Sequence, residues 1–153
     1  GRMISNDDYY ALPNGPVPSA SRDILQKSSF FKDDIAQDYA DQYIKIVNQY
    51  TYTSIQDIDY KVFSKSEIEI LNKIYDNFGD KDQYDLSKLS HEFPEWKKFK
   101  SALDKKLSSR FQIKIEDFFE DYNEKSSLFV NNKEYTELSK SIYEEDLALN
   151  DIL

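Results

Sequence analysis

The single histidine, His91, has the widest chemical range of any side chain in the sequence. Imidazole can transfer protons near neutral pH or ligate a metal ion. A zinc site needs three or four ligands, and without cysteine the others would have to be carboxylates. A Ser-His-Asp triad would also need His91, yet no G-x-S-x-G sequence presents a serine nucleophile. The sequence therefore favours a capping or hydrogen-bonded histidine at a helix end.

Paired carboxylates are the second candidate for chemistry. Catalytic carboxylates need unlike environments that separate their pKa values. The pairs here fall on predicted solvated faces or at helix starts, where acidic side chains favour the positive end of the helix dipole. With three glycines, the chain has no phosphate-binding loop. We therefore expect a binding module rather than an enzyme, with no cofactor and no metal. The pairs are Asp33-Asp34, Glu116-Asp117, Glu120-Asp121 and the run Glu144-Glu145-Asp146.

The length and the charge of the chain limit the number of domains and the class of binding partner. A chain of 153 residues is the usual size of one domain. Its 29 acidic against 20 basic residues give a net charge of −9, which disfavours a nucleic-acid backbone as partner. A basic protein partner, or solubility alone, explains the sign better. No apolar run is long enough to span a membrane, and the absence of cysteine fits a reducing compartment, so we expect a cytoplasmic protein.

The first third of the chain predicts a small antiparallel sheet and two short helices. Asp8–Leu12 is typical of a strand, and Pro13–Pro18 of a rigid turn. Ser19 or Ser21 can cap a helix that ends near Lys27. Asp33-Asp34 can cap a second helix, whose inward face would be Ile35 and Tyr39. The β-branched and aromatic residues that follow favour a hairpin, Tyr43–Val47 with Tyr50–Ile55, over a continued helix, and this hairpin would join the first strand.

The remainder reads as helical. Ser64 and Glu67 form a capping box that starts a helix ending at Gly79, a residue that tolerates a positive φ there. A second helix would stop at Pro94, and Pro94 would begin a third. The expected inward faces are Ile68, Leu71, Ile74, Tyr75 and Phe78; Leu86, Leu89 and Phe93; Trp96, Phe99, Leu103 and Leu107; Phe118, Phe119 and Tyr122; and Tyr135, Leu138, Ile142 and Leu149. Residues 125–133 would be a polar connection. The expected fold class is α+β: a single, mostly α-helical domain with a small antiparallel β-sheet.

Three segments resemble one known family. Residues 9–19, followed by Asp23-Ile24-Leu25, are similar to its "Y-x-A-x-x-x-G-P-V-P-S…D-I-L" signature. Residues 59–75 are similar to its "D-Y-L-S-E-S-E…L-…-Y" stretch, and residues 86–96 to its "L-S-x-L-T/S-H-E-x-x-x-W". The family is that of the Panacea domain, the SocA-like antitoxins, which include phage-associated proteins.

The resemblance also implies a difference at the start of the chain. Family members begin with a helix that ends in "Y-G-R-P-I", and residues 1–4 resemble that end. We therefore expect residues 1–153 to be a single Panacea-like domain that lacks its N-terminal core helix. An intact mass that matches a native start at Gly1 would contradict this expectation.

The resemblance implies an antitoxin that binds and neutralises a protein toxin encoded beside it. One alternative is an adaptor that delivers the toxin to an ATP-dependent protease, and another is an acidic mimic of nucleic acid. No catalytic residues carry over from the family. A hydrolase that uses His91 is the rival from a different class.

Ten residues are candidates for protein binding or for the family motif. They either contact the partner or lock the first strand to the helices, and a motif shared by antitoxins of different toxins favours the second role. The ten are Tyr9, Tyr10, Leu12, Pro13, Gly15, Pro16, Val17, Pro18, His91 and Trp96.

Overall fold

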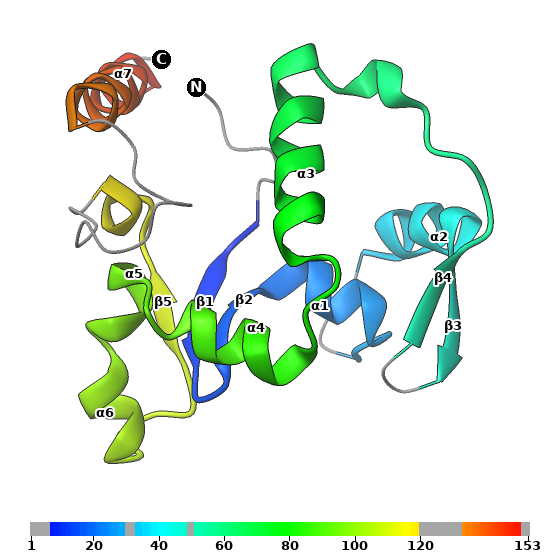
Figure 1. Cartoon of the computed structure of the whole chain (residues 1–153), viewed down its shortest axis with the longest axis horizontal. Coiled ribbons are helices and arrows are strands. Elements are labelled where there is room, and N and C mark those ends of the chain that lie inside the picture. The colour runs from blue at the N-terminus through cyan, green and yellow to red at the C-terminus, as the bar shows by residue number, and fades with distance from the viewer. Residues whose placement is uncertain (1–6, 30–32, 49–50, 120–132, 151–153) are drawn as a thin grey trace.

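The computed structural model describes residues 7–29, 33–48, 51–119 and 133–150. It confirms an α+β fold that is mostly helical, with small antiparallel sheets (Figure 1). The strands are β1 (Tyr9–Leu12), β2 (Gly15–Pro18), β3 (Ile44–Asn48), β4 (Thr51–Ser54) and β5 (Phe111–Ile113). The helices are α1 (Ser19–Leu25), α2 (Asp34–Tyr43), α3 (Lys65–Phe78), α4 (Gln83–Ser90), α5 (Pro94–Lys97), α6 (Lys100–Asp104) and α7 (Lys133–Asn150), with 3₁₀ turns η1 (Tyr60–Val62) and η2 (Ile115–Phe119).

Strand β1, which the sequence predicted, lies at the centre of a three-stranded antiparallel sheet in the order β2-β1-β5. The expectation of a turn over Pro13–Pro18 is wrong for its second half. Only Pro13 and Asn14 turn, and Gly15–Pro18 pairs with β1. Two prolines are tolerated in β2 because it is an edge strand, where a missing N–H removes no bond to a neighbour.

Strand β5 completes the core, and the sequence analysis did not predict this strand. Ile113 of β5 joins Ala11, Trp96 and Leu103 in the buried cluster. Figure 1 shows α5 and α6 beside this sheet. Partly buried aromatic rings surround the cluster: Tyr9, Phe99, Phe111 and Phe118. The core is therefore small and lies between the sheet and the α5–η2 region.

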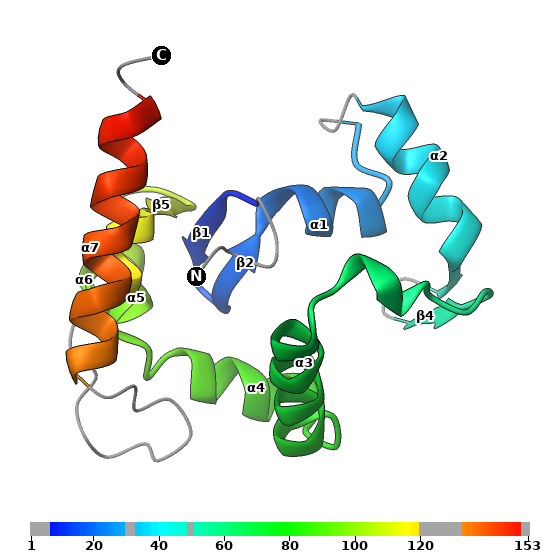
Figure 2. The same ribbon diagram turned by 90° about the horizontal axis from the view of Figure 1, so that it is seen from above.

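The predicted hairpin is confirmed as β3–β4, but it does not join the first strand. It forms its own two-stranded sheet, set apart from β1 in both views (Figures 1 and 2). The physical reason is that β2 and β5 already occupy both edges of β1. The hairpin and α2 therefore extend away from the core.

Helix α3 begins with the predicted capping box. The Ser64 Oγ accepts from the Glu67 N–H at 3.3 Å, and the Glu67 carboxylate accepts from the Ser64 N–H at 2.7 Å. The helix ends at Gly79 as predicted; the φ of Gly79 is −61°, so the positive φ that glycine tolerates is not adopted, and its N–H donates to the Tyr75 carbonyl. The predicted inward face of α3 is largely exposed, with Ile74 48% and Tyr75 76% accessible.

The helix expected after Pro94 is broken into α5 and α6. Trp96 and Leu103 are buried as expected, but Leu107 is 72% exposed because it lies beyond the end of α6. Lys106, just before it, adopts a positive φ of 54° and turns the chain. Phe118 and Phe119 lie in η2, whereas Tyr122 and residues 125–132 fall outside the described residues. The last helix is confirmed as α7, although Tyr135 and Leu149 on its expected inward face are exposed.

The N-terminus of α1 is capped by a residue that the sequence did not indicate. Neither Ser19 nor Ser21 is its cap; the Asp7 carboxylate accepts from the Ala20 and Ser21 N–H groups, each at 2.8 Å, and from the Ser21 hydroxyl at 2.7 Å. Partial burial opposes ionisation of Asp7, but these hydrogen bonds together lower its pKa. Asp7 thus ties the segment that precedes β1 to the N-terminus of α1.

We expect Asp7→Ala to lower the free energy of unfolding by about 1 kcal/mol near neutral pH. Because the pKa of Asp7 is lower in the folded state, its stabilisation is complete above the unfolded pKa, about 3.9, and is lost as the pH falls through the folded pKa. Urea unfolding of both proteins from about pH 6 to about pH 2 should show the difference shrinking. Asp8→Ala, which removes an exposed neighbouring carboxylate, is the control; an equal loss there would contradict the assignment.

Candidate protein-binding groove

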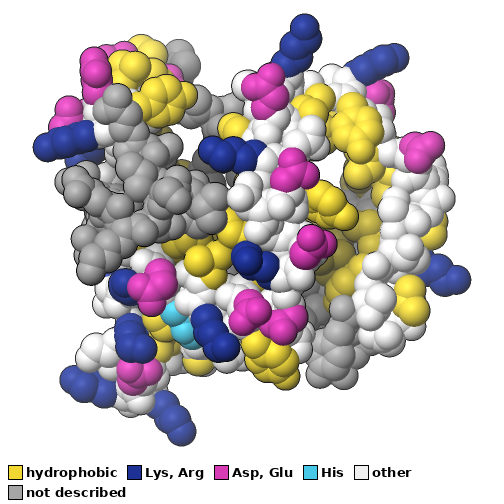
Figure 3. Space-filling model, in the orientation of Figure 1, with side chains coloured by type: hydrophobic (Ala, Val, Ile, Leu, Met, Phe, Trp, Pro, Cys, Tyr) yellow, Lys and Arg dark blue, Asp and Glu magenta, His cyan; other side chains and the backbone are white. Residues whose placement is uncertain are grey.

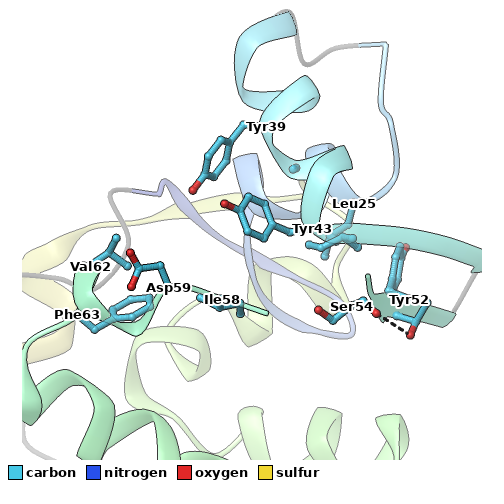
Figure 4. Close-up of a pocket in the computed structure, with 12 residues that line it drawn as sticks. Leu25, Tyr39, Tyr43, Tyr52, Ser54, Ile58, Asp59, Val62 and Phe63 are labelled. Carbon is cyan, nitrogen blue, oxygen red and sulfur yellow. Dashed lines mark hydrogen bonds between the residues drawn. The ribbon is translucent and has the colours of Figure 1, made fainter. Parts of the chain in front are cut away.

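An apolar groove opens between α2, the β3–β4 hairpin and the segment that leads into α3. Its volume is about 500 Å³. In Figure 3 hydrophobic side chains gather in the hollow between α3 and the part of the molecule formed by α2 and the hairpin. Figure 4 is a close-up of the residues that line the groove. The lining consists of Leu25, Tyr39, Ala40, Tyr43, Ile44, Tyr52, Thr53, Ser54, Ile58, Asp59, Val62 and Phe63.

Helix α2 supplies the aromatic wall. Asp33 caps it by accepting from the Ala36 N–H at 3.0 Å. Ile35, Tyr39 and Tyr43 then follow at intervals of four residues, so they share one face. The expectation that Ile35 and Tyr39 pack inward is wrong: they are 84% and 60% exposed, because the elements around α2 leave that face uncovered.

The floor comes from the chain between β4 and α3. Asp59 caps η1 by accepting from the Lys61 N–H at 3.0 Å, which fixes the turn that presents Val62 and Phe63. Gln56 holds this segment to α2 through a hydrogen bond from its Nε2 to the Gln42 carbonyl at 2.6 Å. The groove is thus bounded by hydrogen-bonded turns rather than by a deep core.

The polar groups in the groove are few and lie close together. The Tyr39 and Tyr43 rings are 5.1 Å apart, and interaction with the Tyr39 side chain raises the pKa of Tyr43. The Asp59 carboxylate contributes to the same rise, since a nearby negative charge disfavours a phenolate. Of the twelve lining residues, Asp59 alone carries a charge.

Large apolar side chains on the groove are unusually accessible. Ile58 is 51% and Val62 64% exposed. Scattered apolar residues are normal on a protein surface, but a contiguous patch with polar margins marks an interaction site. The arrangement can bind an apolar segment of another molecule. It shows no set of groups suited to catalysis, and the described residues hold no cluster of three or more metal-ligating side chains.

The motif residues lie elsewhere, where the sheet meets α4 and α5. The Trp96 ring is 2% exposed, donates from Nε1 to the Leu12 carbonyl at 2.8 Å and stacks on His91 at 3.8 Å. His91 ends α4 as expected, but its buried Nε2 has no hydrogen-bond partner among the described residues. Gly15 has a φ of +126°, and a Cβ there would lie 2.6 Å from the Ser90 Oγ.

The other motif residues also build this junction. Tyr9 meets Phe118 edge-on at 5.7 Å, and Tyr10 lies under the Arg110 guanidinium at 4.8 Å. Pro16, Val17 and Pro18 pair with β1, while Pro13 is exposed in the turn. These contacts agree with a structural role of the motif, in which it locks the first strand to the helices. Direct contact of the ten residues with a partner stays a prediction. The sequence did not predict the groove, although the helical spacing of Tyr39 and Tyr43 indicated one of its walls.

A family model described as "Antitoxin SocA-like, Panacea domain" matches residues 1–97. The chain belongs to the SocA-like antitoxin family. The Panacea domain match covers all ten motif residues and the whole groove, whose lining runs from Leu25 to Phe63. Membership supports an antitoxin role for this Panacea protein. No curated protein and no solved structure matches the chain. Within the described residues, no helix is long and apolar enough to cross a membrane.

Proposed function

We propose that this Panacea protein is an antitoxin that neutralises a protein toxin by binding it directly through the groove. The observation that carries the proposal is the exposed apolar groove within the part of the chain that matches the family. Binding would cover the toxin's active surface, so neutralisation needs no chemistry in the antitoxin.

The groove has the composition of a binding hot spot. Tyrosine is enriched at such sites because its ring offers apolar area while its hydroxyl forms hydrogen bonds, and Tyr39, Tyr43 and Tyr52 all line the groove. The net charge of −9 steers basic partners toward the protein. Both features favour a partner that presents an apolar segment on a basic surface.

The test is co-expression with the protein encoded beside it. We expect growth to be restored, the two proteins to purify together, and the amount of toxin to stay constant. Loss of the toxin that depends on an ATP-dependent protease would favour the adaptor alternative. No rescue of growth together with no co-purification would contradict an antitoxin role for this pair.

A further inference from the structure

Inside the groove, apolar walls surround one charged side chain, that of Asp59. The Tyr39 and Tyr43 hydroxyls and the Asp59 carboxylate face the same space (Figure 4). Leu25, Ile58 and the other lining side chains are neutral. A ligand that fills this space therefore meets apolar surface along its length and a negative charge at one point.

The Asp59 carboxylate has spare capacity to accept hydrogen bonds. A carboxylate offers about four acceptor sites. One oxygen of Asp59 accepts from the Lys61 backbone N–H. In the part of the chain that the structure describes, no Lys or Arg side chain forms an ion pair with Asp59.

The residues around the groove also carry a net negative charge. The stretch from residue 33 to residue 63 contains six aspartates and two lysines, a net charge of −4. One of the lysines, Lys45, neighbours Ile44 in β3, so the two side chains point to opposite faces of the hairpin and only Ile44 lines the groove. The other, Lys61, is likewise not among the lining residues. This charge disfavours a second copy of the chain as the occupant, because each copy carries −9.

A basic side chain on an apolar segment matches this environment. The stem of Arg or Lys is apolar and packs on aliphatic walls, while the head pairs with a carboxylate. Cations also bind to the faces of tyrosine rings. On the basis of the proposed function, we propose that the groove receives an Arg or Lys side chain from an apolar segment of the toxin, with Asp59 as its ionic partner.

The decisive variant is Asp59→Asn. Asparagine caps a turn as well as aspartate does, so the bond to the Lys61 N–H is retained while the charge is removed. Asp57→Asn is the matched control, because it makes the same charge change two residues away, outside the lining. With the purified adjacent-gene protein, we expect Asp59→Asn to weaken binding about ten-fold or more, and Asp57→Asn to change it by less than about two-fold. Equal effects of the two variants would overturn the proposal.

A second measurement needs no toxin. Two synthetic helical peptides of about 16 residues with one leucine face are compared, one with arginine and one with norleucine at the centre of that face. The arginine peptide should bind the wild-type protein about five-fold tighter or more, and this preference should vanish with Asp59→Asn. Equal binding of both peptides to the wild type would overturn the proposal even where growth rescue succeeds. Tighter binding of the arginine peptide without rescue of growth would support the cation site and contradict the antitoxin function.

A second copy of the chain is the rival occupant of the groove, and it would give a different result. Self-association that is abolished by Tyr39→Ala would assign the groove to a second copy and overturn the proposal.

Discussion

Trp96→Ala is expected to lower the free energy of unfolding by about 3–5 kcal/mol, as removal of a buried aromatic side chain does elsewhere. Trp96 is 2% exposed, and among the residues that the structure describes the core has four buried apolar members, so little packing remains to fill the cavity. The variant also leaves the Leu12 carbonyl without the indole donor and uncovers the His91 ring. Because a domain of this size is stabilised by about 5–15 kcal/mol in total, a large share of stability would be lost.

Urea unfolding followed by circular dichroism measures this loss without relying on tryptophan fluorescence. Tyr84→Ala is the control, because Tyr84 is an aromatic residue of the adjacent α4 that is 69% exposed. It should change stability by about 0.5 kcal/mol or less. Trp96→Phe keeps a ring but removes the donor, and should fall between the two. A Trp96→Ala protein as stable as the control would contradict the placement of Trp96 at the centre of the core.

Val62→Asp is expected to abolish neutralisation of the toxin while leaving the fold intact. Val62 lines the groove and is 64% exposed, so a carboxylate there is solvated in the free protein. In the complex the same carboxylate would be buried against an apolar segment whose basic side chain is already paired with Asp59, which is strongly unfavourable. We expect toxin affinity to fall at least about thirty-fold, the equivalent of about 2 kcal/mol for a hot-spot residue.

Val47→Asp provides the matched control for the groove. It is the same substitution at a valine of β3 that is 57% exposed and does not line the groove. The control should bind toxin within about three-fold of wild type, and the unfolding curves of both variants should remain close to the wild-type curve. Equal loss of neutralisation in both variants would place the toxin contact elsewhere on the chain.

Local signals in the sequence predicted local structure well. The Ser64–Glu67 capping box, the Asp8–Leu12 strand and the β3–β4 hairpin all depend on neighbouring residues, and all three are present. Strand β5 was missed because three residues are too few to show an alternating pattern. The Asp7 cap was missed because it reaches α1 across the β1–β2 hairpin, a contact that no local rule describes.

The groove was harder to predict for a related reason. Helical spacing identifies apolar faces such as the one formed by Ile35, Tyr39 and Tyr43, but it does not say what packs on them. Burial was the natural expectation for these side chains. Only the arrangement of α2, the hairpin and η1 shows that this face is left open and that Asp59 lies within it.

The two prolines of β2 bear on how a protein with so much accessible apolar surface avoids aggregation. Strand β2 forms one edge of the sheet, and proline offers no N–H to a strand arriving from outside. Pro16 and Pro18 alternate along this edge, so an incoming chain would find acceptors but no donors at both positions. Growth of the sheet into intermolecular fibrils is thereby blocked at that edge. Recognition of partners is left to side-chain surfaces, where specificity can be selected.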